Sequence, residues 1–123
     1  MNGIELTREI AAIADEKQAS EIVALEVGPL VGYTDAIVVC TARNERLANA
    51  IGEEVALRLK REHGLLPARV EGEGGWILLD FLDCILHIFI PETRERYRLD
   101  QLWGEAEQIE LDLEVAATAE RAI

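Results

Sequence analysis

Apolar residues recur at helical spacing in two stretches of the chain. The first stretch, residues 3–18, places four apolar side chains on one helical face: Leu6, Ile10, Ile13 and Ala14. Asn2 followed three residues later by Glu5 is a pair that typically begins a helix. We therefore predict an amphipathic helix over residues 3–18.

The second helical stretch has clear start and stop signals. Asn44 is a suitable N-cap, and Glu45 suits the positive end of a helix. Four apolar residues then recur at every fourth position: Leu47, Ile51, Val55 and Leu59. Gly64 supplies the left-handed residue that commonly ends a helix, so the helix is predicted between Asn44 and Gly64.

Five further stretches are rich in aliphatic and β-branched residues and predict strands: 21–27, 35–42, 67–72, 75–81 and 84–90. The run 35–42 is almost continuously apolar, which is typical of a central strand covered on both faces. Pro67 places its strand at an edge of the sheet. The last two strands flank Leu82-Asp83 and predict a tight hairpin, although these two residues are not the preferred turn chemistry.

The predicted order of elements is α-β-β-α-β-β-β-α, with a short, broken helix over residues 92–104 after Pro91. Some strands follow each other directly and others are separated by a helix, so we expect a mixed five-stranded sheet of the α/β (α+β) class. Residues 1–104 are interpreted as one domain. Residues 105–123 are interpreted as an acidic C-terminal extension, either a frayed helix or a mobile segment.

The alternation of side chains along the predicted hairpin points to a docking surface. Trp76, Leu78 and Asp80 share one face of their strand, and three apolar residues share the other: Ile77, Leu79 and Phe81. Two long helices and one short helix are expected to leave part of one apolar face uncovered. A residual apolar patch with a Trp at its edge is typical of a protein-binding surface. The alternative is that all of these residues belong to the core.

The charge of the chain narrows the class of partner. Asp and Glu number 24 against 12 Lys and Arg, which gives a net charge of −12. An acidic surface repels phosphate backbones, so the charge argues against a nucleic-acid-binding protein and favours a basic protein partner. The alternative is that the charge only keeps the protein soluble.

Motifs for catalysis, cofactors and metals are missing from the sequence. It has no phosphate-binding loop, no dinucleotide loop and no nucleophile elbow, and Ser20 is its only serine. Cys40 and Cys84 lie in apolar runs and are interpreted as buried free thiols. No apolar run reaches the roughly 20 residues that a membrane span needs, and no secretory or organelle signal opens the chain, so a cytoplasmic location is expected.

Asp80, Asp83 and His87 are the one group that suggests catalysis, as metal ligands or as an acid and a base. Turns select Asp for bonding to the local backbone, and a His among aliphatic residues is more often a core residue, so the structural interpretation is favoured. The carboxylates of Glu71, Glu73 and Asp80 would likewise suit a metal-dependent transferase, but no phosphate-cradling loop accompanies them.

Three separated segments resemble the Iojap/RsfS family of ribosomal silencing factors: TDAIVVCTARNERLANAI at 34–51, EGEGGWILLDFLDCILHIF at 71–89 and PETRERYRLDQLWG at 91–104. The first is similar to the Thr-Asp, strand and helix entry of that family, the second to its Trp-x-Leu-Leu-Asp and His-x-Phe pattern, and the third to its Pro-Glu-x-Arg, Tyr-x-Leu and Leu-Trp pattern. Five positions depart from the family pattern: Ala36, Ala42, Asn44, Leu82 and Arg96.

The resemblance implies a nucleotidyltransferase-like fold without catalytic motifs. It also implies binding to ribosomal protein L-fourteen of the large ribosomal subunit, steric obstruction of subunit joining and repression of translation. Self-association into a homodimer is a further implied property. No cofactor, metal, catalytic residue, membrane or specific nucleic acid enters this interpretation.

We assign the partner-binding surface to six residues: Trp76, Leu78, Asp80, Tyr97, Leu99 and Trp103. The aromatic residues are expected to anchor the contact, and Asp80 to meet Lys or Arg of the partner, whereas core packing is an equal alternative for Trp103. Two other functions stay open at this point. One is a metal-dependent nucleotidyltransferase-like enzyme, and the other is a homodimeric scaffold with a different partner.

Overall fold

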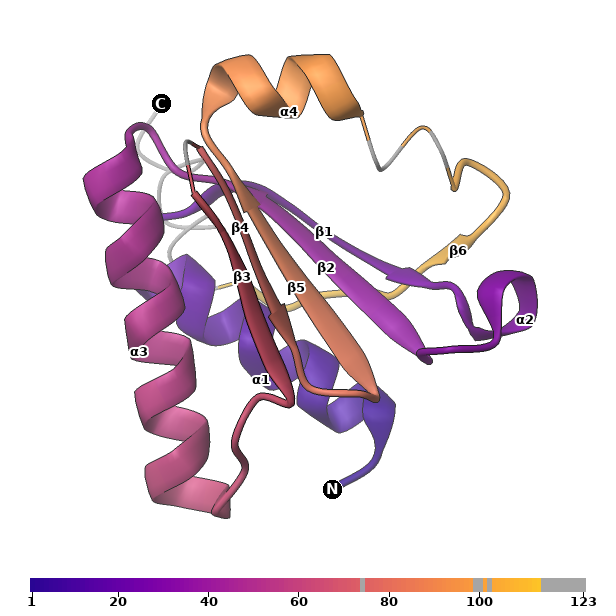
Figure 1. Cartoon of the computed structure of the whole chain (residues 1–123). Coiled ribbons are helices and arrows are strands. Elements are labelled where there is room, and N and C mark those ends of the chain that lie inside the picture. Colours follow the sequence, from indigo (N-terminus) through magenta and orange to yellow (C-terminus); the bar gives the residue numbers. More distant parts are fainter. Residues whose placement is uncertain (74, 99–100, 102, 114–123) are drawn as a thin grey trace.

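Within the described residues, 1–73, 75–98, 101 and 103–113, this computed structural model contains four helices and six strands (Figure 1). The helices are α1 (Gly3–Glu16), α2 (Gly28–Val31), α3 (Glu45–His63) and α4 (Pro91–Tyr97). The strands are β1 (Ser20–Glu26), β2 (Ala36–Thr41), β3 (Arg69–Glu73), β4 (Trp76–Asp80), β5 (Cys84–Phe89) and β6 (Glu107–Gln108).

The strands form one mixed sheet in the order β3-β4-β5-β2-β1-β6. β2 and β5 pair in parallel, with Ala36 opposite Cys84 and Thr41 opposite Phe89, and the other neighbours are antiparallel. The predicted fold class is therefore confirmed. The prediction of five strands falls one short, because β6 adds a sixth strand beside β1.

Both long helices begin where the sequence signals predict, and α3 also ends at its predicted stop, whereas α1 ends at Glu16 rather than at residue 18. Asn2 Oδ1 accepts a hydrogen bond from the backbone N–H of Glu5 at 2.8 Å, and Asn44 Oδ1 accepts one from Leu47 at the same distance. Gly64, at φ +64°, ends α3 in the left-handed conformation. Each cap satisfies a backbone group that the helix itself leaves without a partner.

Helices α1 and α3 cover one face of the sheet and form the larger part of the core with it. The helices contribute Leu6, Ile10, Ile51, Val55 and Leu59, and the strands contribute Val38, Cys40, Leu79, Leu86 and Ile88. Every residue of β2 and β5 is buried, which confirms the central position predicted for 35–42. Cys40 and Cys84 are free buried thiols, as predicted, and burial raises the pKa of each to about 12.

The segment after β1 differs from the prediction. Gly28-Pro29 ends the strand as expected, but the chain then forms α2, with Pro29 in its first turn and Gly32 ending it at φ +78°. A four-residue helix is too short to show apolar periodicity in a sequence. In the segment predicted as a short, broken helix over 92–104, α4 ends at Tyr97 and Gln101 is again helical, whereas residues 99, 100 and 102 lie outside the described residues.

The described part of the C-terminal segment is extended and packed, so the prediction of a frayed helix or mobile segment is wrong for residues 107–113. Gln108 pairs with Leu25, and the backbone N–H of Ile109 donates to the carbonyl of Ala24 at 2.8 Å. The alternating apolar residues that follow pack against the helix-covered core: Ile109, Leu111 and Leu113. The division of the chain at residue 104 stays a prediction.

The predicted hairpin is present, and its turn is strained at Leu82. The backbone N–H of Phe81 donates to the carbonyl of Cys84 at 3.0 Å, and Leu82 has φ +72° while 63% of its surface is exposed. A left-handed backbone costs an ordinary residue roughly 1–2 kcal/mol, whereas Gly adopts it without a steric penalty. The turn is therefore closed by a residue that does not suit its conformation.

Replacing Leu82 by Gly is expected to raise the free energy of unfolding by about 0.5 kcal/mol, because relief of this strain exceeds the extra flexibility of Gly in the unfolded chain. Urea unfolding measures the change. Leu66→Gly is the matched control, since Leu66 is also an exposed leucine but its φ is not positive, and this change should not stabilise the protein. A Leu82→Gly protein less stable than the parent would contradict the prediction.

The described helices include none that is both long and apolar enough to cross a lipid bilayer.

Candidate functional site

The face of the sheet opposite α1 and α3 carries no long helix among the described residues (Figure 1). We call this side the open face. Its buried residues are Leu25, Val27, Ile37, Val39, Ile85 and Phe89. Helix α2 and the segment before β6 cover it in part, because Val31 of α2, Trp103 and Ala106 pack against these residues. The expectation that the helices leave one apolar face incompletely covered is therefore confirmed.

Strand alternation places the predicted residues of β4 on the open face. Trp76 lies opposite Phe89 of β5, Leu78 opposite His87, and Asp80 opposite Ile85. All three β4 side chains are half-buried. Ile77, Leu79 and Phe81 point the other way and pack in the core below α1 and α3. The alternation of side chains read from the sequence thus assigns both faces of β4 correctly.

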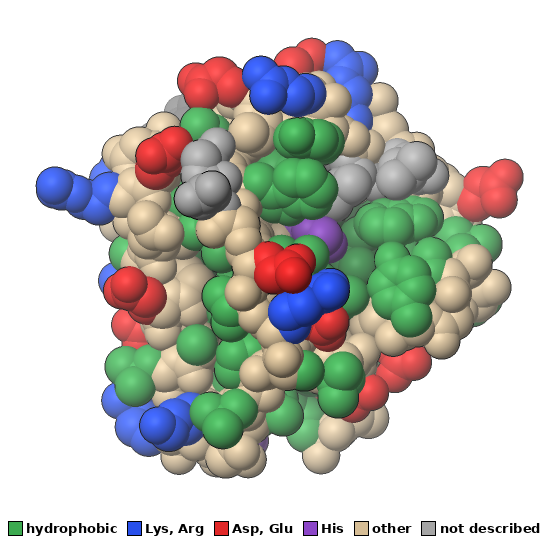
Figure 2. All heavy atoms as spheres, viewed as in Figure 1, with side chains coloured by type: hydrophobic (Ala, Val, Ile, Leu, Met, Phe, Trp, Pro, Cys, Tyr) green, Lys and Arg blue, Asp and Glu red, His purple; other side chains and the backbone are tan. Residues whose placement is uncertain are grey.

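Four rings gather at the end of the open face that lies below α4, and we call them the aromatic cluster: Trp76, His87, Phe89 and Tyr97. The Trp76 ring centroid lies 4.5 Å from that of Tyr97 and 5.1 Å from that of Phe89. Phe89 is fully buried below, whereas Tyr97 is 43% exposed on the outside. Figure 2 shows apolar side chains gathered at the surface around a histidine on this face.

Helix α4 is held over the cluster by hydrogen bonds to the residue before β4. Thr93 Oγ1 donates to the carbonyl of Gly75 at 2.5 Å, and the backbone N–H of Ile90 donates to the same carbonyl at 3.0 Å. Arg94 Nη1 donates to Thr41 Oγ1 at 3.0 Å and so connects α4 to the end of β2. These bonds fix the position of Tyr97 relative to Trp76.

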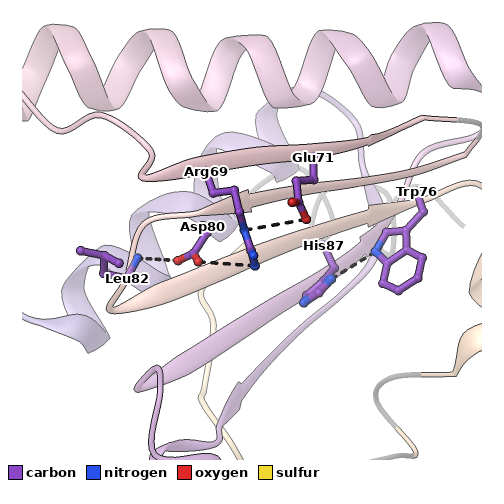
Figure 3. A network of polar contacts seen from close by, with 6 residues as sticks. All are labelled: Arg69, Glu71, Trp76, Asp80, Leu82 and His87. Carbon is purple, nitrogen blue, oxygen red and sulfur yellow. Dashed lines mark hydrogen bonds and ion pairs between the residues drawn. The ribbon is translucent and has the colours of Figure 1, made fainter.

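A side-chain hydrogen bond joins two members of the aromatic cluster. Trp76 Nε1–H donates to His87 Nδ1 at 3.2 Å (Figure 3). His87 is only 6% exposed, and its burial lowers the pKa of the imidazole from 6.5 to about 4. Removal of water disfavours the charged ring, so His87 is neutral at pH 7 and its Nδ1 can accept the bond. The interpretation of His87 as a core histidine with a satisfied partner is confirmed.

Charged residues lie along the open face beside Leu78. Arg69 Nη2 lies 3.8 Å from Asp80 Oδ2, and Arg69 Nε lies 3.8 Å from Glu71 Oε2 (Figure 3). Asp80 Oδ1 also accepts a hydrogen bond from the backbone N–H of Leu82 at 2.8 Å. Asp80 therefore holds the hairpin turn, as its position in the sequence suggests, and Arg69 offsets part of its charge within the protein.

The side chains of Asp80 and His87, two of the three residues weighed as a catalytic group, bond to separate local partners. Asp80 bonds to the turn, His87 to Trp76, and the backbone carbonyl of Asp83 accepts from the N–H of Ala36 at 3.3 Å. Within the residues that the structure describes, the candidate metal-ligand group is a different one, Glu9, Glu62 and His63, on the helices. There His63 Nε2 lies 2.8 Å from Glu9 Oε1, which joins α3 to α1.

The structure brings most of the predicted surface residues together. Trp76, Leu78 and Asp80 share the open face, Tyr97 contacts Trp76, and Trp103 is half-buried against the same face. Leu99 lies outside the described residues. The role of all six residues as partner contacts stays a prediction.

Sequence reasoning missed two parts of this surface. It did not place Phe89 beneath Trp76, because that requires the β4–β5 register. It also overlooked the turn after β1, where Leu30 and Tyr33 are among the exposed large apolar residues. The available signal was three apolar residues in a short loop rich in Gly and Pro.

Comparisons with a family model, with known sequences and with solved structures agree with one another. Residues 1–122 match the family model described as "Ribosomal silencing factor during starvation". Ribosomal silencing factors of Halalkalibacterium halodurans and Bacillus subtilis are each 31% identical to this chain, over 91% of it and 97% and 96% of their own lengths. A crystal structure of a Chromobacterium violaceum protein superimposes with a TM-score of 0.80, at 25% identity, over 85% of this chain and 88% of that one.

Proposed function

Because the chain belongs to the family of ribosomal silencing factors, we propose that it binds the large ribosomal subunit through its open face and prevents the small subunit from joining. The contact is with ribosomal protein L-fourteen of the large subunit, and the outcome is repression of translation in the cytoplasm. In this function the chain acts by occupying space and transforms no substrate.

The observation that carries the proposal is the exposed side of the aromatic cluster. Tyr97 and half-buried Trp76 present adjoining rings on a face that no long described helix covers. Trp and Tyr are enriched among the residues that dominate binding energy at protein interfaces. The bond from Thr93 in the first turn of α4 to Gly75, and the bond from Trp76 to His87, hold these rings in place before a partner arrives, so binding requires little reordering.

The charge of the protein supports a protein contact on the ribosome rather than an RNA contact. A net charge of −12 repels the phosphate backbone of ribosomal RNA and attracts a basic ribosomal protein. The attraction is screened by salt, so the rate of association should fall as ionic strength rises.

A subunit-joining assay tests the function directly. Purified small and large subunits are mixed with the protein, without nucleotide, and separated on a sucrose gradient. We expect free subunits to accumulate at the expense of joined ribosomes and the protein to sediment with the large subunit. Joined ribosomes in normal amount at saturating protein would contradict the proposal, and a requirement for nucleotide would favour the enzymatic alternative.

Replacing Trp76 by Ala is expected to weaken binding to the large subunit by about 1–3 kcal/mol, or roughly five- to 150-fold, because it removes a ring that is already fixed in place. Co-sedimentation over a range of protein concentrations measures the affinity. Leu57→Ala is the control, since Leu57 is exposed on α3, away from the open face. A folded Trp76→Ala protein with parental affinity would remove Trp76 from the contact.

A further inference from the structure

The orientation of the Trp76 ring depends on a single directional interaction among the described residues. Contacts with Phe89 and Tyr97 hold the ring by packing, which restrains its position but has little dependence on rotation. The bond from Trp76 Nε1 to His87 Nδ1 has a preferred line of approach, because hydrogen bonds weaken when they bend. It therefore selects one orientation of the indole from those that the packing allows.

The geometry of the sheet explains how these residues meet. His87 lies directly opposite Leu78, and Trp76 lies opposite Phe89, so Trp76 and His87 are diagonal neighbours across β4 and β5. A long side chain is needed to cross this diagonal, and the indole of Trp76 leans along the strand to reach it. Its ring centroid lies 6.0 Å from that of His87.

His87 itself is buried and cannot make a sizeable direct contact with a partner. Only 6% of its surface is exposed, whereas Trp76 is half-buried and Tyr97 is 43% exposed. Any contribution of His87 to binding must therefore pass through the residue that it holds.

We propose that His87 is a positioning residue for partner binding: through Nδ1 it fixes the Trp76 indole in the orientation that meets the large subunit. This inference rests on the proposed function. It assigns to His87 a role in affinity that is separate from its place in the core.

Two substitutions separate this role from packing. His87→Asn keeps an acceptor oxygen close to the position of Nδ1, whereas His87→Leu fills similar space without an acceptor. Leu also suits a buried strand position, so loss of binding in a folded His87→Leu protein is not a consequence of unfolding. Proton NMR of the indole N–H, with the Trp76 signal identified by its loss in Trp76→Phe, reports the bond directly.

We expect His87→Leu to shift the Trp76 indole N–H signal upfield and to weaken binding to purified large subunits by roughly three- to tenfold, the range of one net hydrogen bond. His87→Asn should restore most of the signal position and the affinity. In a Trp76→Phe background, where no indole N–H exists, His87→Leu should have no further effect on affinity.

Two results would overturn the proposal. One is an unchanged affinity in His87→Leu, and the other is an equal loss of affinity in the parent and in the Trp76→Phe background. Both leave the proposed function intact, because the parent protein still binds. If the parent protein itself fails to bind large subunits, the proposed function fails, and the role of His87 in binding fails with it.

Discussion

Replacing Phe89 by Ala should lower the free energy of unfolding by about 3–5 kcal/mol, the range for removing a fully buried Phe from a core. Phe89 is 0% exposed and lies at the end of the central strand β5. It pairs with Thr41 in parallel and with Trp76 in antiparallel register, so a cavity at this point borders both neighbouring strands. A loss of this size is a large part of the total stability of a small domain.

The Phe89 change should also reduce binding to the large subunit, because Phe89 supports the rings that are proposed to meet it. Its centroid lies 5.1 Å from that of Trp76 and 6.2 Å from that of Tyr97. Urea unfolding measures the stability. Co-sedimentation without urea, under conditions in which the variant is folded, measures the binding. Leu57→Ala should change stability by less than about 0.5 kcal/mol. A loss below about 1.5 kcal/mol for Phe89→Ala would show that the site collapses around the missing ring.

Acidification should destabilise the protein through His87. The pKa of His87 is about 4 in the folded protein, lowered from 6.5 by burial, so between these values the unfolded chain takes up a proton that the folded protein does not. The contribution of neutral His87 is therefore complete above pH 6.5 and is lost as the pH falls towards 4. This contribution to the free energy of unfolding is about 3 kcal/mol, obtained by multiplying the lowering of the pKa by the free energy that corresponds to one pKa unit.

The comparison that isolates this effect uses His87→Asn, which has no ionisable ring. Unfolding free energies of parent and variant are measured between pH 7 and pH 4, and their difference cancels the contributions of all other titrating groups. We expect the parent to lose about 3 kcal/mol more than the variant over this interval. Parallel pH profiles of the two proteins would mean that His87 is protonated in the folded state at pH values close to 6.5.

The elements predicted from the sequence are those with local signals. The helix from Asn44 to Gly64 has a cap at each end, and the run 35–42 has an apolar composition that only a central strand tolerates, so both were identified without knowledge of the fold. Helix α2 carries no such signal, because four residues do not complete an apolar repeat. Strand β6 depends on its partner: Glu107 and Gln108 are polar, and only the backbone of β1 makes them a strand.

The candidate site was predictable to the level of a face but not to the level of contacts. Alternation alone places Trp76 and Leu78 on one side of β4, and that part is confirmed. The bond between Trp76 and His87 requires the register of two strands and the lean of one side chain, which no pattern within one strand contains. The pairing of Asp80 with Arg69 likewise depends on the β3–β4 register.

The parallel pairing of β2 with β5 determines at which stage of synthesis and folding the open face forms. Ala36 pairs with Cys84, more than a third of the chain further on, and pairings between distant segments form late in folding. A nascent chain that has emerged only as far as β4 possesses Trp76 but lacks the neighbouring strand β5 and helix α4. Under the proposed function, a nascent chain that lacks β5 and α4 therefore does not obstruct the ribosome that synthesises it, and inhibitory capacity arises only once these two elements have emerged.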